Sequence, residues 1–276
     1  MSAFEVKKLL STDTVVIRHV GCSGRCRHRS PEECVSATEM VFPHRGTYVR
    51  HVGRDQSVAD ANHVLLFSAR QGYQVSHPVG GGDESLVVRL PEAVLGEIAP
   101  RSLLVHDGAL GFRRQSLRVD PRAQALVALL RHTLESGAIE PLEAESLALT
   151  LAARTLGPGA SHAPAATAGR RKLADRVKVL LASDLSRRWA LNEIAAEIGG
   201  SAVYLTQLYR AVEGIPLYRY QLRLRLASAL HRLAHVEDLS ALAADLGFSS
   251  HSHFTAAFRQ AYGRSPAAFR QSTRAA

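Results

Sequence analysis

The last third of the chain repeats one pattern of apolar and polar residues. The first copy covers residues 191–210, and the second covers residues 239–259 with one extra residue in its turn. In each copy, apolar residues recur at helical spacing, glycine interrupts the pattern, and a second helical run follows. Each copy therefore predicts a helix, a tight turn and a second helix, the helix-turn-helix pattern whose second helix enters a DNA major groove.

The two copies agree position by position. The first has two apolar stripes around a glycine turn, formed by Leu191, Ile194, Ala195, Ile198, Gly199, Gly200, Val203, Leu205, Leu208 and Tyr209. The second repeats this arrangement with Leu239, Leu242, Ala243, Leu246, Gly247, Phe254, Ala257 and Phe258. Gly247 stands where the turn needs a positive φ, and Ser249 or Ser250 is placed to cap the next helix. We expect Phe248, Phe254, Phe258 and Trp189 in the core.

The segment between the copies predicts how far apart the two units lie. Residues 217–234 would form a helix about 27 Å long at 1.5 Å per residue. Two recognition helices at its ends would lie about one DNA turn apart, near 34 Å, and would face the same side of a duplex. A single helical hairpin of this kind is as often a packing unit as a DNA-binding unit. The repetition favours DNA binding.

Candidate base-reading residues are those that face away from the apolar stripes. They are Ala202, Val203, Thr206, Gln207 and Arg210 in the first copy and Ser250, His251, Ser252, Thr255, Ala256 and Arg259 in the second. Gln207 suits adenine, and Thr206 or Thr255 suits a thymine methyl. Arg210 and Arg259 lie further along their helices and are expected to reach phosphate.

The first 156 residues have a different pattern. Runs typical of β-strands occur at residues 14–20, 37–42, 47–52, 63–68, 72–76 and 84–90. Many short strands separated by Gly and Pro predict a small sandwich or barrel. Helices are expected at residues 91–98, 121–136 and 141–155, each beginning with proline in its first turn. The fold class is therefore α+β, with a β-rich domain followed by an all-α domain.

A linker is expected between the two domains. Residues 157–169 lack large apolar residues and are rich in Gly, Pro and Ala. The predicted domains are residues 1–156 and 170–276, with helix-turn-helix units at about 191–212 and 239–262.

The positive charge is concentrated in the second domain. Residues 170–276 hold 16 Lys and Arg against 8 Asp and Glu, a net charge of +8 out of +9 for the chain. Almost all of these bases are arginine, whose planar fork suits phosphate and guanine edges. The plainer interpretation of any one arginine is a solvated face in an Arg-rich protein. The contrast between the halves favours a nucleic-acid partner.

Residues 247–270, GFSSHSHFTAAFRQAYGRSPAAFR, resemble the signature of the AraC/XylS family of bacterial transcription regulators. The first copy with Gly214, Pro216 and Tyr220 resembles the upstream half of that signature. The resemblance covers about 100 residues and implies seven helices with two helix-turn-helix units joined by a long helix, binding promoter DNA as an activator or repressor. Ala256 and Gln207 stand where the family often has a basic residue, so no operator sequence follows.

The resemblance also implies a cupin-like sensing and dimerisation domain before the DNA-binding half. The partners it implies are double-stranded promoter DNA, a small-molecule effector, RNA polymerase and a second copy of the chain. The helices at 121–136 and 141–155 carry leucines that would either pair two subunits or cover the open face of the barrel: Leu126, Leu129, Leu130, Leu134, Leu142, Leu147, Leu149 and Leu151.

All three cysteines lie within 13 residues, as Cys22, Cys26 and Cys34, with His28 between them. These four side chains have the number and type of ligands of a tetrahedral zinc site. A reversible disulfide is an alternative, and so is a loop whose thiols bind nothing in a reducing cytosol. The spacing is not a standard zinc signature. A site here would be the sensory input.

Other histidines carry weaker signals. His44, His51, His63 and His77 are expected as polar lining or surface residues, which together would line a pocket. The closely spaced histidines of a cupin metal motif are absent from the sequence.

Two alternatives to an effector-controlled regulator remain. The β-rich domain would be an enzyme, either an alkylation-repair protein whose cysteine accepts a methyl group or a cupin oxygenase. Alternatively, the basic half would bind nucleic acid without sequence preference. The missing fourth cysteine disfavours methyl transfer, so we expect no enzyme. No signal peptide or membrane span is evident, which predicts a cytoplasmic protein.

Overall fold

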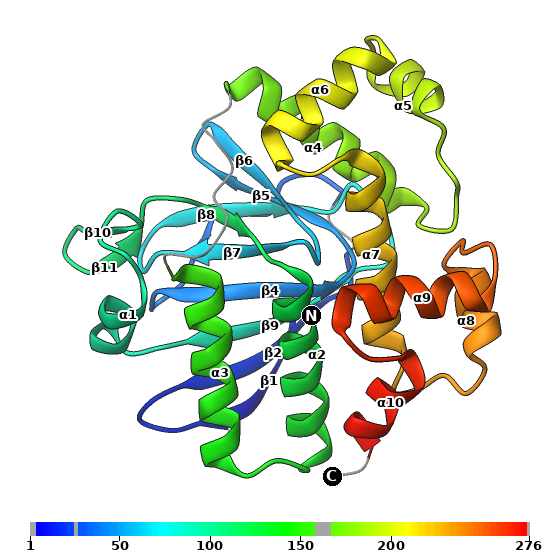
Figure 1. Cartoon of the computed structure of the whole chain (residues 1–276). Helices are drawn as coiled ribbons and strands as arrows, with labels where there is room; N and C mark the ends of the chain where they lie inside the picture. The colour runs from blue at the N-terminus through cyan, green and yellow to red at the C-terminus, as the bar shows by residue number, and fades with distance from the viewer. Residues whose placement is uncertain (1–3, 25–26, 158–166, 275–276) are drawn as a thin grey trace.

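The computed structural model describes residues 4–24, 27–157 and 167–274. Figure 1 shows a β-rich part with helices on one face, followed by an all-helical part. This arrangement confirms the α+β class predicted from the sequence. The elements of the first part are β1 (Phe4–Ser11), β2 (Val16–Cys22), β3 (Glu33–Cys34), β4 (Glu39–Arg45), β5 (Tyr48–Val52), β6 (Asp55–Ala59), β7 (His63–Phe67), β8 (Gly72–Ser76), β9 (Asp83–Arg89), α1 (Glu92–Ile98), β10 (Leu104–His106), β11 (Leu110–Phe112), β12 (Ser116–Arg118), α2 (Pro121–Ser136) and α3 (Pro141–Leu156).

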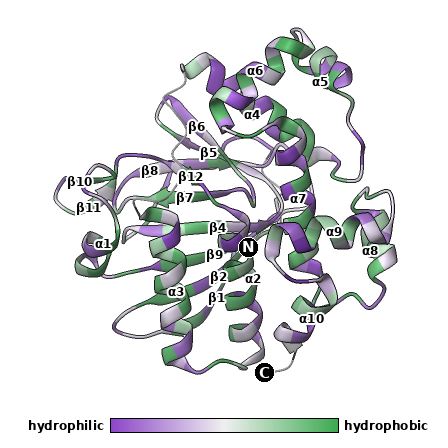
Figure 2. Cartoon of the chain, in the orientation of Figure 1, coloured by the Kyte–Doolittle hydropathy of each residue, from purple (hydrophilic) through white to green (hydrophobic). Residues whose placement is uncertain are grey.

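Two antiparallel sheets form a sandwich. The larger has the order β1-β2-β9-β4-β7-β12, and the smaller has the order β3-β8-β5-β6. Apolar side chains from both inner faces pack between them, including Val41, Leu65 and Val87 from the larger sheet and Tyr48 and Val75 from the smaller. Figure 2 shows hydrophobic residues along the central strands β4, β7 and β9, which are buried on both faces.

Helices α2 and α3 cover the outer face of the larger sheet. Both begin with the predicted proline, and Asp120 caps α2 by accepting a hydrogen bond from the Ala123 N–H. Leu130 and Leu151 are fully buried against this face, and most of the other expected leucines pack partly against it. Leu142 is the exception, with 74% of its surface exposed. Most of the leucine stripe therefore covers the sheet.

The carboxy-terminal part contains seven helices among the described residues. They are α4 (Ala168–Ser183), α5 (Leu191–Ile198), α6 (Ala202–Glu213), α7 (Leu217–Arg232), α8 (Leu239–Asp245), α9 (His251–Tyr262) and α10 (Pro266–Arg274). Helices α4 to α6 share one core with the first half of α7, and α8 to α10 share another with its second half. Helix α7 therefore joins two small helical units (Figure 1).

The two parts of the chain are in direct contact. Helix α2 packs against α7, α9 and α10, and Ala128 of α2 belongs to the core formed by α7 to α10. Helix α4 begins at Ala168, inside the predicted linker, and residues 158–166 of that linker lie outside the described residues. Among the described helices, none is both long and apolar enough to cross a membrane.

Candidate DNA-binding surface and the contact between the domains

Helices α5 and α6 form the first helix-turn-helix unit. Gly199 and Gly200 connect them with φ values of +84° and +127°, a conformation that favours glycine. Ser201 then caps α6, because its Oγ accepts a hydrogen bond of 3.1 Å from the Tyr204 N–H. The sequence therefore stops one helix and starts the next within three residues.

Helices α8 and α9 form the second unit in the same way. Gly247 has φ +74°, and a Cβ there would lie 2.1 Å from the Ser186 carbonyl oxygen. Any larger residue at this position would force the turn away from the first unit. Of the two serines predicted as caps, Ser250 caps α9, since its Oγ accepts a hydrogen bond of 3.1 Å from the His253 N–H.

The predicted base readers lie on the outer faces of α6 and α9. Ala202 and Thr255 are half-buried, and the remaining readers are exposed: Val203, Thr206, Gln207, Arg210, Ser250, His251, Ser252, Ala256 and Arg259. The hydroxyl of Thr206 donates to the Ala202 carbonyl at 2.9 Å, which leaves its methyl group to face outward. Figure 1 shows the two helices in separate units on either side of α7.

The sequence predicts Val203 both as part of an apolar stripe and as a base reader. Val203 is 66% exposed and does not belong to the apolar stripe of α6, which consists of Leu205, Leu208, Tyr209 and Val212. A residue two positions before Leu205 lies on the opposite side of a helix. Sequence reasoning missed Tyr204, which is 44% exposed in the first turn of α6. Its position three residues after Ser201, the capping residue of α6, is the sequence signal that could have identified it.

Arg225 of α7 ties the two units together. Its Nε donates to the Leu185 carbonyl at 2.7 Å and its Nη2 donates to the Arg187 carbonyl at 2.8 Å, both in the loop before α5. Its Nη1 donates to the carbonyl of Gly247, the turn residue of the second unit, at 3.3 Å. One guanidinium thus spans both units and fixes their relative position.

A buried polar network joins the helical domain to the sandwich. The Tyr220 hydroxyl of α7 donates to Asp60 Oδ2 at 2.5 Å, and His63 Nδ1 lies 3.0 Å from Asp60 Oδ1. On its other side, His63 Nε2 lies 3.4 Å from Glu213 Oε2 at the end of α6. Lys178 of α4 binds Glu213 Oε1 at 2.7 Å. All five side chains are almost completely buried.

Each charged group in this network favours the charged form of its neighbour. Although burial opposes it, the Lys178 ammonium and His63 hold the pKa of Glu213 well below its usual range. Burial likewise disfavours charge on Lys178, yet Glu213 and Asp175 raise its pKa. The pKa of His63 is raised too: burial and Lys178 lower it, and Asp60 and Glu213 outweigh them. The contact between the domains is thus ionic at its centre.

The cysteine-rich loop is only partly described, because Cys26 lies outside the described residues. Cys22 is buried at the end of β2, and Cys34 is exposed in β3. Cys22 lies within 4.8 Å, atom to atom, of the ring of His77 and the carboxylate of Asp83, and His77 Nε2 is 2.6 Å from Asp83 Oδ1. The zinc set Cys22, Cys26, His28 and Cys34 stays a prediction.

The four histidines expected as lining or surface residues are all buried. Their exposed fractions are 8% or less for His44, His51, His63 and His77. His63 belongs to the network between the domains, and His77 pairs with Asp83. Of the two positions expected for them, lining or surface, the surface position is therefore wrong.

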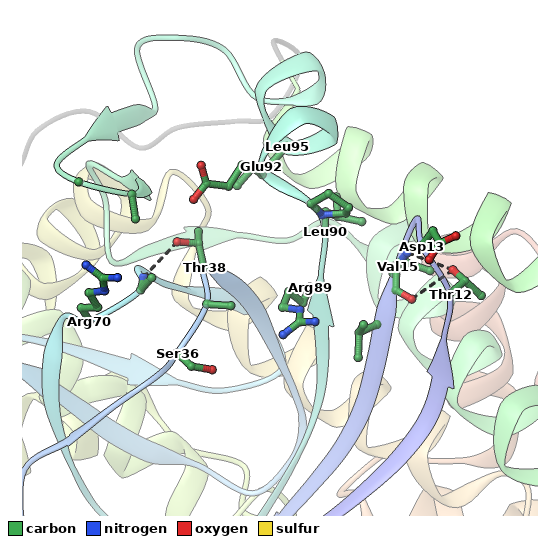
Figure 3. A pocket seen from close by; sticks show the side chains of 16 residues that line it. Thr12, Asp13, Val15, Ser36, Thr38, Arg70, Arg89, Leu90, Glu92 and Leu95 are labelled. Carbon is green, nitrogen blue, oxygen red and sulfur yellow. Dashed lines mark hydrogen bonds between the residues drawn. The ribbon is translucent and has the colours of Figure 1, made fainter.

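The sandwich has a polar cavity of about 510 Å³ next to α1. Figure 3 shows Thr38, Arg70, Arg89 and Glu92 around one hollow. Thr38 Oγ1 accepts a hydrogen bond of 3.0 Å from the Ala69 N–H at its wall. Arginine and carboxylate side chains both line it, and its size suits a small polar molecule. No sequence motif predicts this cavity, because its lining comes from five separate segments.

A model of a helix-turn-helix domain matches residues 194–272. The transcriptional activator RhaR of Klebsiella pneumoniae is 34% identical over 147 residues, which cover 53% of this chain and 51% of that protein. The regulatory protein PocR of Salmonella typhimurium is 34% identical over 88 residues, 32% of this chain and 29% of that protein. The chain thus spans about half the length, or less, of these curated relatives.

Two solved structures illustrate what this chain is similar to. An AraC-type transcriptional regulator from Chromobacterium violaceum covers 38% of this chain and 96% of its own at 25% identity and a TM-score of 0.36. ToxT from Vibrio cholerae covers 98% of both chains at 11% identity and a TM-score of 0.35. These scores are too low to support a conclusion about the fold.

Proposed function

We propose that this chain is a sequence-specific DNA-binding transcription regulator of the AraC type, because residues 194–272 match a helix-turn-helix domain and a transcriptional activator is similar over half of the chain. One observation carries the proposal. Two helix-turn-helix units, fixed to each other by Arg225, expose the outer faces of α6 and α9. Two such helices can enter successive major grooves of promoter DNA.

Base recognition is divided between the two helices. Gln207 on α6 can pair with adenine through both ends of its amide, and the methyl groups of Thr206 and Thr255 suit thymine. Arg210 and Arg259 are in the last turns of their helices and would neutralise phosphates. His251 and Ser252 begin α9, the part of a recognition helix that comes nearest to base edges.

The sandwich is proposed to receive the signal. Its polar cavity next to α1 has the size and mixed charge to hold a small effector. The partners of this arrangement are promoter DNA, a second copy of the chain and RNA polymerase, and its place is the cytoplasm. The relatives of known role are regulators, which supports a binding protein over an enzyme.

Removing the base-reading groups of α6 tests the proposal. Thr206→Ala with Gln207→Ala removes one methyl contact and one bidentate amide pair, and the amide pair contributes about 1–3 kcal/mol of discrimination. We expect the affinity for a selected operator to fall at least about tenfold, with affinity for random DNA unchanged. The measurement is fluorescence anisotropy on both duplexes at one salt concentration.

Gln271→Ala is the matched control, because Gln271 is exposed on α10 and is not one of the predicted base readers. It should bind the operator as the unchanged protein does. Equal losses on operator and random DNA would instead favour the nonspecific binder, whose affinity depends on charge alone.

A further inference from the structure

Three histidines and one glutamate meet where the helical domain contacts the sandwich. His19 comes from β2, His44 from β4, Glu84 from β9, and His231 from the last turn of α7. The three sandwich residues lie on the outer face of the larger sheet, away from the space between the two sheets. They belong neither to the cysteine-rich loop nor to the polar cavity next to α1.

The three sandwich residues form a compact set of donor atoms. One ring nitrogen of His19, one of His44 and one oxygen of Glu84 all lie within 4.8 Å of one another. His44 occupies an irregularity in the pairing of β4 with β9, between Pro43 and Arg45. A β-bulge of this kind redirects a side chain, and it turns the His44 ring toward its neighbours.

His44 is the residue that points most clearly to a ligand-binding site. The residue is 92% buried, and neither of its ring nitrogens has a hydrogen-bond partner among the described residues. A buried imidazole without partners is costly unless something binds it.

The two carboxylate oxygens of Glu84 have different neighbours. Oε1 accepts a hydrogen bond of 2.8 Å from Arg45 Nε, and Oε2 lies 3.5 Å from His19 Nε2 and 4.0 Å from His231 Nδ1. Arg45 therefore orients the carboxylate and leaves Oε2 among the histidines.

The helical domain adds the fourth side chain. The ring of His231 stacks on that of His44 with centroids 5.4 Å apart, and its Nδ1 also lacks a hydrogen-bond partner among the described residues. A cavity of about 20 Å³ lined in part by His44 and His231 lies at this contact. Neither His19 nor Glu84 lines it, so this cavity lies beside the cluster.

We propose that His19, His44 and Glu84 of the sandwich, with His231 of the helical domain, bind one divalent first-row transition metal ion such as Zn²⁺. Two or three imidazoles with one carboxylate are a ligand set typical of such ions. In a tetrahedral zinc site the donor atoms are about 3.3–3.6 Å apart. The donor atoms of His19, His44 and Glu84 already lie within 4.8 Å of one another, and His231 Nδ1 lies 4.0 Å from Glu84 Oε2, so small side-chain rotations reach this spacing.

The surrounding residues are those that a metal site requires. His19 Nδ1 lies 3.8 Å from Glu135 Oε1, so the nitrogen facing away from the cluster has a carboxylate to orient it. The two nearby guanidinium groups are both paired, Arg45 with Glu84 and Arg131 with Glu135. Arg45 binds Oε1 of Glu84, and Oε2 is the oxygen that faces the histidines.

The ion would fasten the two domains together, because its ligands come from both. Metal availability would then set how firmly α7 is held against the sandwich. This regulatory consequence rests on the proposed function; the existence of the site does not, since metal binding is measured without DNA.

The test begins with full-length protein freed of metal by a chelator and dialysed. Titration of Zn²⁺ against a chromophoric competitor should give one ion per chain. His44→Gln and Glu84→Gln should each weaken binding at least about tenfold, the lower bound seen when even the supporting residues of a metal site are changed. His106→Gln, exposed on β10, is the matched control and should bind zinc as the unchanged protein does.

Cys22→Ser separates this site from the cysteine-containing alternatives. Cys22 belongs both to the cysteine-rich loop and to the group with His77 and Asp83. We expect Cys22→Ser to retain its zinc, and bound Co²⁺ to show visible d–d bands without a thiolate charge-transfer band. Loss of zinc in Cys22→Ser with retention in His44→Gln would overturn the proposal, as would no zinc at all in the unchanged protein.

His231→Gln tests the contribution of the helical domain. Hydrogen exchange of the last turns of α7 should slow when zinc is added to the unchanged protein. In His231→Gln, zinc should bind more weakly and leave that exchange unaltered. Equal zinc protection of α7 in both proteins would refute a site shared between the domains. Unchanged circular dichroism of each variant verifies that the chain is folded.

Discussion

Individual buried charged side chains stabilise the contact between the two domains. Glu213 stands at the centre, because it binds Lys178 of its own domain and His63 of the sandwich. A buried ion pair adds little by itself, but removing one partner leaves the other charged in a medium that cannot solvate it. The network is therefore a point where single substitutions have large effects.

Glu213→Gln removes that central charge while keeping the side chain's size. Lys178 would remain buried with only Asp175 as a close anionic partner, and the loss of a partner in a buried pair costs about 3–5 kcal/mol. We expect the free energy of unfolding to fall by about this amount in urea denaturation. Glu197→Gln, exposed on α5, should change it by less than about 0.5 kcal/mol. A similar small change in both variants would show that the network is not ionic.

At the scale of elements, α7 sets the geometry for reading DNA. The helix spans Leu217–Arg232 and carries a core on each side, one for each helix-turn-helix unit. Arg225 lies near its middle and holds the loop before α5 and the turn after α8. Specific binding by two helices requires a fixed separation, since each must meet its own groove.

Arg225→Met should therefore weaken DNA binding without touching a base reader. It removes the hydrogen bonds between the units while keeping most of the side chain's apolar stem. We expect at least about a tenfold loss of affinity for an operator with both half-elements and a smaller loss for a single half-element. Arg176→Met, an exposed arginine on α4, controls for the loss of charge. Equal losses for one and two half-elements would contradict a positioning role.

At the scale of the whole molecule, the helical domain is docked on the sandwich through α2. His132 of this helix is buried, and its Nε2 lies 2.7 Å from Arg131 Nη2 and 3.3 Å from the Leu230 carbonyl oxygen of α7. Burial, with Arg131, lowers the pKa of His132 to about 3. This contact therefore requires a neutral imidazole and is sensitive to acid.

Acid should loosen the docked arrangement. An unfolded histidine takes up a proton near pH 6.5, whereas His132 in the folded chain stays neutral down to about pH 3. The stability due to His132 is thus fully present above pH 6.5 and is lost as the pH falls toward 3, by about 1.4 kcal/mol per unit. In the presence of a chelator, the free energy of unfolding of His132→Gln should depend less steeply on pH between 6 and 4.5. The same slope in both proteins would assign the effect to other groups.

The sequence predicted elements well and contacts poorly. Helices α5 to α9 and both turns follow from apolar spacing and glycine, because these are local properties. The apolar pattern does not predict strands β1, β3, β6 and β10 to β12, since they are short or exposed and lack a clear alternation. Val203 was counted in the apolar stripe because its type is apolar, although its position faces outward.

The candidate metal site shows what the sequence cannot reveal. His19, His44, Glu84 and His231 are separated by 25, 40 and 147 positions and share no motif. A β-bulge and the docking of α7 bring them together. The cysteines, by contrast, lie close together in the sequence, so a sequence pattern alone is enough to suggest a site there.

The central claim is sequence-specific recognition of DNA by two units held at a fixed distance. In vitro selection from a pool of random duplexes, using the full-length protein without added effector or metal, tests it most directly. The account predicts enrichment of one bipartite site whose half-elements are about 10 base pairs apart, one turn of DNA. A pool that stays random through successive rounds, with retention that depends only on salt, would contradict it.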